Sequence, residues 1–152
     1  MSFRDSVKSV ESRRQSEYVA PGRYLFRIND FKEGTTRKGD EFVVGELQIV
    51  DSNDLDRHPR GSERSYWQKT SADTAARNIR TFIAKALNCP DDALTSEMID
   101  KAFEKKEDTG RSPLSGLLIA CNAREITTRA GRPYTLCDWI AVDQDVESLD
   151  DI

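Results

Sequence analysis

The sequence predicts a mainly β protein with helices, in the α+β class, and three observations support that class. Short runs of residues alternate between apolar and polar side chains, which is the period of a half-buried strand. One central segment, residues 71–87, changes to the helical period. Two segments, residues 35–42 and 127–134, share the pattern Thr-Thr-Arg-x-Gly-x-x-aromatic and lie between apolar runs. This pattern is typical of a β-hairpin tip, because glycine supplies the positive φ that a tight turn demands.

Three strands are expected in the first half of the chain. Residues 1–20 hold few apolar side chains, so we expect a loose N-terminal arm there. A strand follows, with Tyr24, Phe26 and Ile28 on one side. Two more strands are expected at residues 42–50 and 63–69.

The second half is expected to hold two helices and two strands. In residues 71–87 the apolar side chains recur at helical spacing, and Ser71 is available as the N-cap. A shorter helix is expected at residues 95–105, and strands at 116–126 and 134–142, on either side of the second tip. The order is therefore three strands, a helical section and two strands.

This order predicts a five-stranded OB-fold barrel with a helical insertion between strands 3 and 4. The expected division of the 152-residue chain is an N-terminal arm at 1–20, an OB-fold domain at 21–142 and an acidic flexible C-terminal tail at 143–152. OB-folds bind oligonucleotides on the face of strands 2 and 3 and with the loops between strands 1–2 and 4–5. The two similar tips fall in those two loops.

Both tips and the third strand carry the residue types that single-stranded nucleic acid requires. Cations follow the phosphate backbone, and exposed aromatic rings stack on bases of any sequence. Tyr66 and Trp67 are adjacent, so only one of them can face a ligand, and the sequence does not choose between them. The alternatives to ligand binding are that the aromatic side chains of the strands belong to the core and that the cations of the loops are only solvated. The candidate DNA-binding residues are Lys32, Arg37, Lys38, Arg64, Tyr66, Trp67, Lys69, Arg129, Arg132 and Tyr134, and Arg124 adds a further cation beside the second tip.

The net charge of −4 is unevenly distributed. Residues 143–152 hold five acidic and no basic residues, so the remainder of the chain carries −4 + 5 = +1. Like-charge runs of this kind are typically disordered and interact through their charge. We expect the tail to recruit partner proteins or to compete with DNA for the basic groove, the alternative being a solubilising terminus. The candidate tail residues are Asp145, Glu147, Asp150, Asp151 and Ile152.

The chain resembles the phage-encoded single-stranded-DNA-binding proteins with an OB-fold. The resemblance covers residues 20–142. The residues that carry it are Pro21-Gly22-Arg23-Tyr24, Gly116-Leu117-Leu118-Ile119 and the hairpin Thr127-Thr128-Arg129-Ala130-Gly131-Arg132-Pro133-Tyr134 with Trp139. It implies sequence-tolerant binding of single-stranded DNA in phage replication or recombination, in the host cytoplasm. It also implies that the tail recruits replication or recombination proteins, although no Pro-Phe pair follows its acidic pair as in the bacterial pattern.

Other function classes find less support in the sequence. No run approaches the length of a membrane span, and the start lacks the apolar core of a secretory signal, so we expect a cytoplasmic protein without a membrane partner. Cys121 and Cys137 are expected to be cross-strand neighbours and, with Cys89, ordinary thiols.

No catalytic or cofactor site is expected either. His58 is the single histidine, and the glycines do not have the spacing of a phosphate-binding loop, so we expect no enzyme activity, no metal and no cofactor. Two alternatives remain: a phage protein-interaction module for assembly or host-factor inhibition, and a metal-dependent nuclease using Asp138. The sequence leaves the oligomeric state open, a homo-oligomer included.

Overall fold

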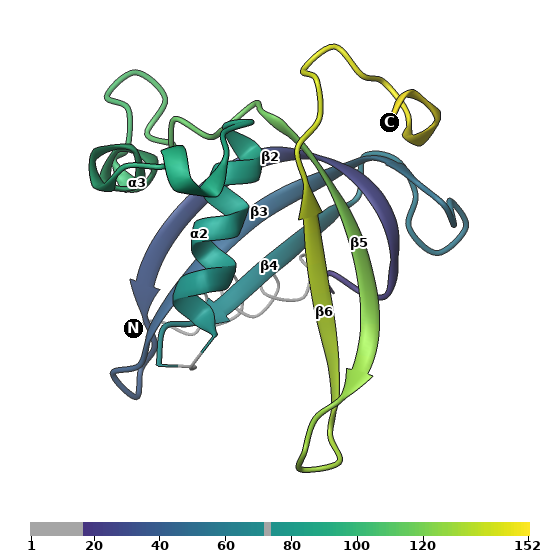
Figure 1. Ribbon diagram of the computed structural model, residues 1–152, viewed down its shortest axis with the longest axis horizontal. Coiled ribbons are helices and arrows are strands. Elements are labelled where there is room, and N and C mark those ends of the chain that lie inside the picture. Colours follow the sequence, from purple (N-terminus) through teal and green to yellow (C-terminus); the bar gives the residue numbers. More distant parts are fainter. Residues whose placement is uncertain (1–16, 72–73) are drawn as a thin grey trace, which may run out of the picture.

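The computed structural model describes residues 17–71 and 74–152, which form a curled six-stranded sheet with helices on one side (Figure 1). The strand order in the sheet is β1-β4-β3-β2-β5-β6. All neighbouring strands are antiparallel except β1 and β4, which are parallel. The strands are β1 (Glu17–Tyr18), β2 (Gly22–Thr35), β3 (Glu41–Ser52), β4 (Glu63–Lys69), β5 (Leu118–Thr127) and β6 (Pro133–Ile140).

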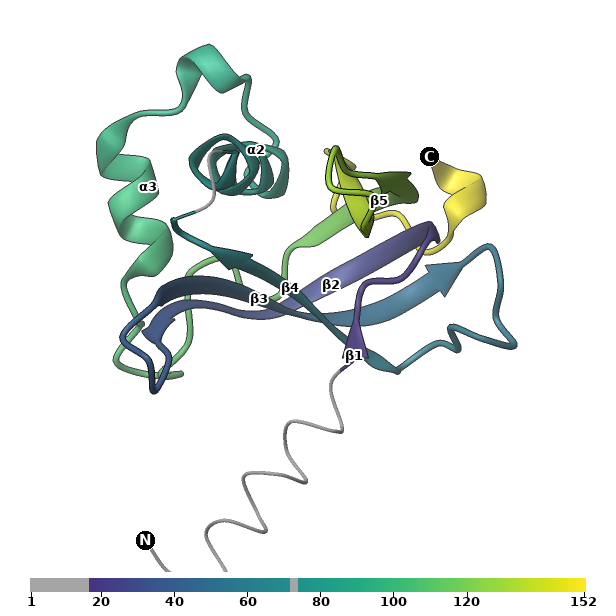
Figure 2. The ribbon, with the colours of Figure 1, turned by 90° about the horizontal axis from the view of Figure 1, so that it is seen from below.

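The long strand β2 organises the curl because it pairs with β3 from Tyr24 to Thr35 and with β5 from Gly22 to Arg27. Two register shifts interrupt the β2–β3 ladder, one between Leu25 and Phe26 and one between Ile28 and Asp30. Such bulges bend a strand and increase its twist. The sheet consequently curls into a half-barrel with a concave face (Figure 2).

The α-helices α2 (Ala75–Ala86) and α3 (Ser96–Phe103) lie over this concave face. Phe82 of α2 is fully buried, and its ring centroid lies 5.4 Å from that of Tyr66 and 4.8 Å from that of Trp139. Through the ring of Phe82, the helix therefore contacts both β4 and β6, two strands that do not pair with each other. Gly45 leaves room for this approach, since a Cβ there would lie 3.3 Å from Phe82 Cζ, closer than an ordinary van der Waals contact.

The predicted class, mainly β with helices, is confirmed, but the predicted strand count and helix position need correction. The sheet has six strands instead of five, and no helix lies between β3 and β4; the helices follow β4, the fourth strand. The additional strand, β1, comes from the segment expected to be a loose arm. It has only two residues, too few for an alternating pattern to reveal it. Residues 1–16 of the predicted arm lie outside the described residues.

The helix starts also differ in detail from the prediction. The longer helix begins at Ala75 after Thr74, so Ser71 is not its N-cap. Thr95 caps α3, where its hydroxyl oxygen accepts a hydrogen bond from the Met98 amide at 3.2 Å. No helix in the described part of the chain has the length and apolar character needed to cross a membrane.

The acidic C-terminal segment, expected to be a flexible tail, makes specific contacts with the sheet. Val146 and Leu149 pack on an apolar cluster of Leu25, Leu118, Ala120 and Val142, and Val50 and Ile140 also border it. The Leu149 amide donates a hydrogen bond to Asp51 Oδ2 at 2.8 Å. The segment ends in the short 3₁₀-helix η2 (Leu149–Asp151). It lies at the end of the molecule opposite the two hairpin tips (Figure 1).

Candidate nucleic-acid interface

The first tip, between β2 and β3, is closed by three hydrogen bonds around Thr36. Its amide donates to the Asp40 carbonyl at 2.8 Å, and its own carbonyl accepts from the Gly39 amide at 2.9 Å. Its side-chain Oγ1 accepts from the Asp40 amide at 3.2 Å. Gly39 has φ +88°, a left-handed conformation that glycine adopts without steric cost.

The second tip, between β5 and β6, repeats these bonds around Thr128. Its amide donates to the Arg132 carbonyl at 2.9 Å, its carbonyl accepts from the Gly131 amide at 2.9 Å, and its Oγ1 accepts from the Arg132 amide at 3.3 Å. Gly131 has φ +76°. The repeated pattern is therefore a repeated turn. The second threonine and the glycine of the pattern form the loop, whereas the arginine of the pattern, Arg37 or Arg129, takes no part in these three bonds.

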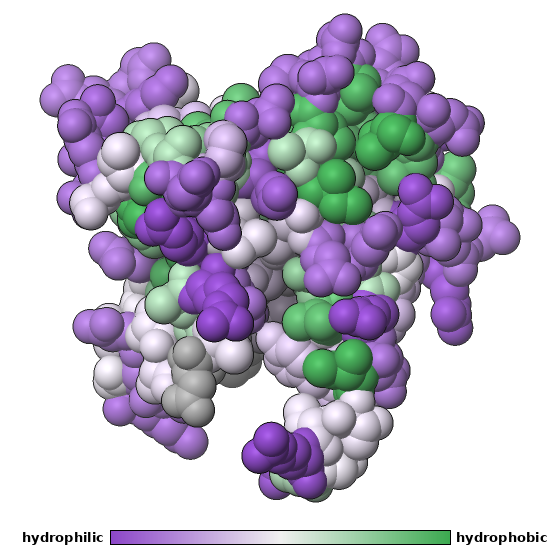
Figure 3. Space-filling model, viewed as in Figure 1, coloured by the Kyte–Doolittle hydropathy of each residue, from purple (hydrophilic) through white to green (hydrophobic). Residues whose placement is uncertain are grey.

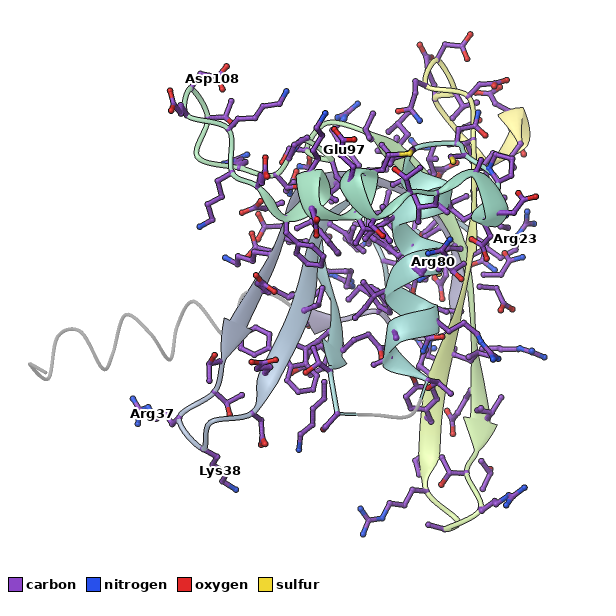
Figure 4. The ribbon with its side chains drawn as sticks, turned by 60° about the vertical axis from the view of Figure 1, so that its left-hand side comes forward. Arg23, Arg37, Lys38, Arg80, Glu97 and Asp108 are labelled. Atoms are coloured by element: carbon purple, nitrogen blue, oxygen red, sulfur yellow. The ribbon has the colours of Figure 1, made fainter. Side chains whose placement is uncertain are left out.

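The tips carry four cations that are free for a ligand. These side chains are exposed, and none makes an ion pair within the described residues: Arg37, Lys38, Arg129 and Arg132. Both tips project from the same end of the molecule. Arg37 and Lys38 extend outward from the first tip (Figure 4). This end therefore gathers positive charge from two segments far apart in the sequence.

Two further predicted cations are neutralised by neighbouring carboxylates. Lys32 Nζ lies 3.0 Å from Glu46 Oε1, and Lys69 Nζ lies 3.3 Å from Asp40 Oδ2. All four side chains are 40–45% exposed. Ion pairs this exposed contribute at most about 1 kcal/mol, so a phosphate can replace the carboxylate partner at little cost.

Trp67 faces outward on β4, away from α2, and is 37% exposed. It stacks on Phe42 of β3, with ring centroids 5.7 Å apart and an interplanar angle of 27°. Phe42 in turn covers Gly34, where a Cβ would come within 2.7 Å of the ring. We call Trp67 and Phe42 the aromatic platform. Lys69 lies opposite Phe42 in the ladder and Lys32 opposite the neighbouring Val44, so cations border the platform.

The prediction that Arg64 and Tyr66 contact DNA is wrong, because both side chains lie in the interior. Alternation along β4 turns residues 64, 66 and 68 toward the concave face, so Tyr66 packs against Phe82 and is 7% exposed. Burial also raises the pKa of Tyr66. The sequence could not choose the buried side, because each side of β4 offers one aromatic ring and at least one cation.

The Arg64 guanidinium is held inside by several partners. It donates from Nη1 to the Glu63 carbonyl at 2.7 Å and from Nη2 to His58 Nδ1 at 3.3 Å, and Nη2 also lies 3.8 Å from Glu17 Oε2. Burial and the neighbouring Arg64 charge lower the pKa of His58. His58 thus helps to hold the Arg64 side chain of β4 in the interior.

Tyr134 lies on a different surface from Trp67. Its ring is 38% exposed, and its hydroxyl lies 3.5 Å from Nε2 of the inward-facing Gln68. It therefore stands at the gap between β4 and β6, on the helix side. Of the predicted residues, the four tip cations lie at one end of the molecule, whereas Arg64 and Tyr66 are buried and Trp67 and Tyr134 lie on different surfaces.

Sequence reasoning did not place Phe42 among the site residues, although a signal was present. Phe42 occupies the aromatic position of the first repeat, which is the position that Tyr134 occupies in the second. Its equivalence to a candidate residue could have identified it.

The predicted tail residues lie far from this interface. Asp151 uses Oδ2 to accept hydrogen bonds from the amides of Glu147 and Ser148, at 2.9 and 3.1 Å. This carboxylate closes the 3₁₀-turn, whereas Asp145, Glu147 and Asp150 are exposed to solvent. Ile152 is 48% exposed.

The two expected cysteine neighbours are diagonal and not directly opposite. Cys121 pairs with Trp139, and Cys137 pairs with Ala123, so both thiols face the interior one pair apart. A hydrogen bond with Cys137 and burial raise the pKa of the Cys121 thiol, which keeps it protonated and unreactive. Within the described residues, no three or more His, Cys, Asp or Glu side chains are grouped so that they could hold a metal ion.

Comparison with known proteins identifies no relative: no protein-family model matches the chain, and no curated protein matches its sequence.

Proposed function

We propose that the chain is a non-enzymatic, sequence-tolerant single-stranded-DNA-binding protein built on an OB-fold barrel. The observation that carries this proposal is that two turns with the same hydrogen bonds present four cations without ion pairs in the described residues, and that the first of these turns leads into the platform of Phe42 and the exposed Trp67. Cations that release counterions and rings that stack on bases are the two requirements of single-strand binding.

The connections between strands support the barrel. β2 pairs with both β3 and β5, β4 lies beside β3, and β6 lies beside β5. The ring contact of Tyr66 with Trp139, with centroids 4.7 Å apart, links β4 to β6 and closes the half-barrel through side chains. In such a barrel, the tips form the two loops that OB-folds use for oligonucleotides.

The binding would proceed by charge and then by stacking. Arg37, Lys38, Arg129 and Arg132 capture the backbone, and phosphates then displace Glu46 and Asp40 from their lysine partners. One base stacks on Trp67, which is worth about 1–3 kcal/mol. A role in phage DNA replication or recombination, with the tail recruiting partner proteins, follows from the family resemblance.

The proposal is tested by anisotropy titration of labelled oligo-dT at several salt concentrations, with oligo-rU and duplex DNA as competitors. Each phosphate contact contributes a slope of about −0.7 in log K against log salt for single strands. Arg37→Ala combined with Arg129→Ala should therefore weaken binding and flatten the slope by about 1.4.

Lys105→Ala combined with Lys106→Ala is the matched control, because it removes the same charge from the loop around Asp108 at the other end of the molecule (Figure 4). The control should keep the wild-type slope. An equal loss in both double variants would mean that net charge, and not the tips, determines binding. No binding of oligo-dT or oligo-rU by the wild type would refute the proposal and favour a protein-interaction module.

A further inference from the structure

The hairpin of β5 and β6 has an outer face that is directed away from the helices. The hairpin projects from the body of the molecule as a separate prong (Figure 3). Along β5, Ile119, Cys121 and Ala123 belong to the core cluster that packs against the helices. Because side chains alternate along a strand, Asn122 and Arg124 lie on the outer face, where both are exposed.

Arg23 of β2 lies beside Arg124 on this outer face. Arg23 pairs with Asn122 in the β2–β5 ladder, and its Nε donates a hydrogen bond to Asn122 Oδ1 at 3.3 Å, so the two side chains share one side of the sheet. In Figure 4 Arg23 points outward, away from α2. Diagonal neighbours in such a ladder have Cα atoms about 7–8 Å apart, so Arg23 and Arg124 are adjacent cations. We call them the arginine pair.

Both guanidinium groups of the arginine pair keep their terminal nitrogens free within the described residues. Arg23 uses only Nε, for the bond to Asn122, and makes no ion pair there. Arg124 Nε lies 3.7 Å from Asp138 Oδ2, and these two side chains are 67% and 55% exposed. An ion pair this exposed is weak. The terminal nitrogens are therefore available for a bidentate contact with phosphate, for which the arginine fork is suited.

The arginine pair is continuous with the second tip. Arg124 precedes Thr128, the first residue of that turn, by four residues, which is about 13 Å along an extended strand. Ile126 lies between them on the same side of β5 and is 37% exposed. Beyond the arginine pair the outer face is closed, because the C-terminal segment packs on Leu25 and Ala120. A nucleic-acid strand held by the tip thus has a route along β5 that stops at this segment.

We propose that the bound DNA strand continues from the second tip onto this outer face, where the arginine pair binds two further phosphates. The inference rests on the proposed single-strand binding and extends its footprint beyond the two tips. Asp138 lies on the same face, since it pairs with Asn122 in the β5–β6 ladder. Its carboxylate repels a phosphate at the arginine pair, so it limits the affinity of this part of the site.

The first test removes the arginine pair. Arg23→Gln combined with Arg124→Gln should flatten the slope of log K against log salt by about 1.4, because each phosphate contact with a single strand contributes about 0.7. Anisotropy titrations use labelled oligo-dT of about 16 nucleotides, the upper site size of an OB-fold, so that the strand is long enough to reach the outer face.

Arg27→Gln combined with Arg111→Gln is the matched control for this charge change. Arg27 lies on the same side of β2, but Leu25 and the C-terminal segment packed on it separate Arg27 from Arg23. Arg111 lies in the loop after α3, and both control arginines are exposed. The control should keep the wild-type slope.

The second test is a variant that should bind more tightly, a result that misfolding does not produce. Asp138→Asn removes the repelling carboxylate and should tighten oligo-dT binding about two- to fivefold at about 0.1 M salt, where charges more than about 10 Å apart are largely screened. Glu125→Gln is the matched control, because Glu125 is exposed next to Arg124 but points to the opposite side of β5. Its affinity should stay near that of the wild type.

The outcomes separate this inference from the proposed function. Tight binding by the wild type with an unchanged slope in the Arg23→Gln, Arg124→Gln variant would overturn the extended footprint and leave the binding function intact. Equal slope changes in the two double variants, or equal gains for Asp138→Asn and Glu125→Gln, would also overturn it, because net charge would then explain the effects. No binding of oligo-dT by the wild type would overturn both proposals.

Discussion

Replacing Asp51 with alanine removes the acceptor that holds the C-terminal segment against the sheet. The Asp51 carboxylate accepts from the Leu149 amide at 2.8 Å, from the Ser52 amide at 2.9 Å and from Arg60 Nη2 at 3.3 Å. A hydrogen bond to a charged group contributes about 1.5–3 kcal/mol. The Arg60 side chain is 63% exposed, so its ion pair adds little.

The two amide bonds therefore set the expected magnitude. They are coupled through one carboxylate, so their contributions do not add fully, and Asp51→Ala should lower the free energy of unfolding by about 2–4 kcal/mol. Urea unfolding at neutral pH measures this change. Asp150→Ala is the control, since Asp150 is exposed and belongs to the same acidic segment. A loss below about 0.5 kcal/mol for Asp51→Ala would refute the reasoning, because that is the range of ordinary surface substitutions.

The same carboxylate makes the stability depend on pH with a definite sign. Burial acts to raise the pKa of Asp51, but the amides of Leu149 and Ser52 and the Arg60 guanidinium outweigh it and lower the pKa below its usual value. The folded state therefore binds this proton less readily than the unfolded state. The stabilisation is present above the ordinary carboxyl pKa and is lost as the pH falls through the lower folded value. The stability difference between the wild type and Asp51→Asn should thus shrink as the pH is lowered below the ordinary carboxyl pKa.

Four other variants have distinct expected results. Trp67→Ala should weaken oligo-dT binding by about 1–3 kcal/mol and lower the free energy of unfolding by only about 0.5–1.5 kcal/mol, through the lost stacking on Phe42. The neighbouring Tyr66→Ala should lower the free energy of unfolding by about 3–5 kcal/mol, and similar stability losses would contradict the assignment of faces. Gly131→Ala should cost about 1–2 kcal/mol in thermal unfolding through its positive φ alone, because a Cβ there meets nothing within 4 Å. Deletion of residues 143–152 should destabilise the protein and leave the salt slope of DNA binding unchanged; a tighter complex would instead support competition of the tail for the groove.

Local patterns in the sequence determined the hairpins and the longer helix. Period-two alternation and the repeated turn motif were sufficient for both tips, because a turn depends on a few neighbouring residues such as Thr36 and Gly39. The helical period likewise located most of α2, since an apolar stripe must face the sheet. Its N-cap was placed three residues early, at Ser71 instead of Thr74, because periodicity alone does not locate the start of a helix.

Only the tertiary structure decided which side of β4 is buried and where the C-terminal segment docks. Alternation is symmetrical between the two sides of a strand, so the burial of Tyr66 followed from the position of Phe82, sixteen residues later. The acidic segment looked like a free tail because its charge is local, whereas its partner Asp51 lies 98 residues away in the chain. The contact of Arg23 with Asn122 has the same origin, because the two residues are 99 positions apart in the chain and only the pairing of β2 with β5 brings them together.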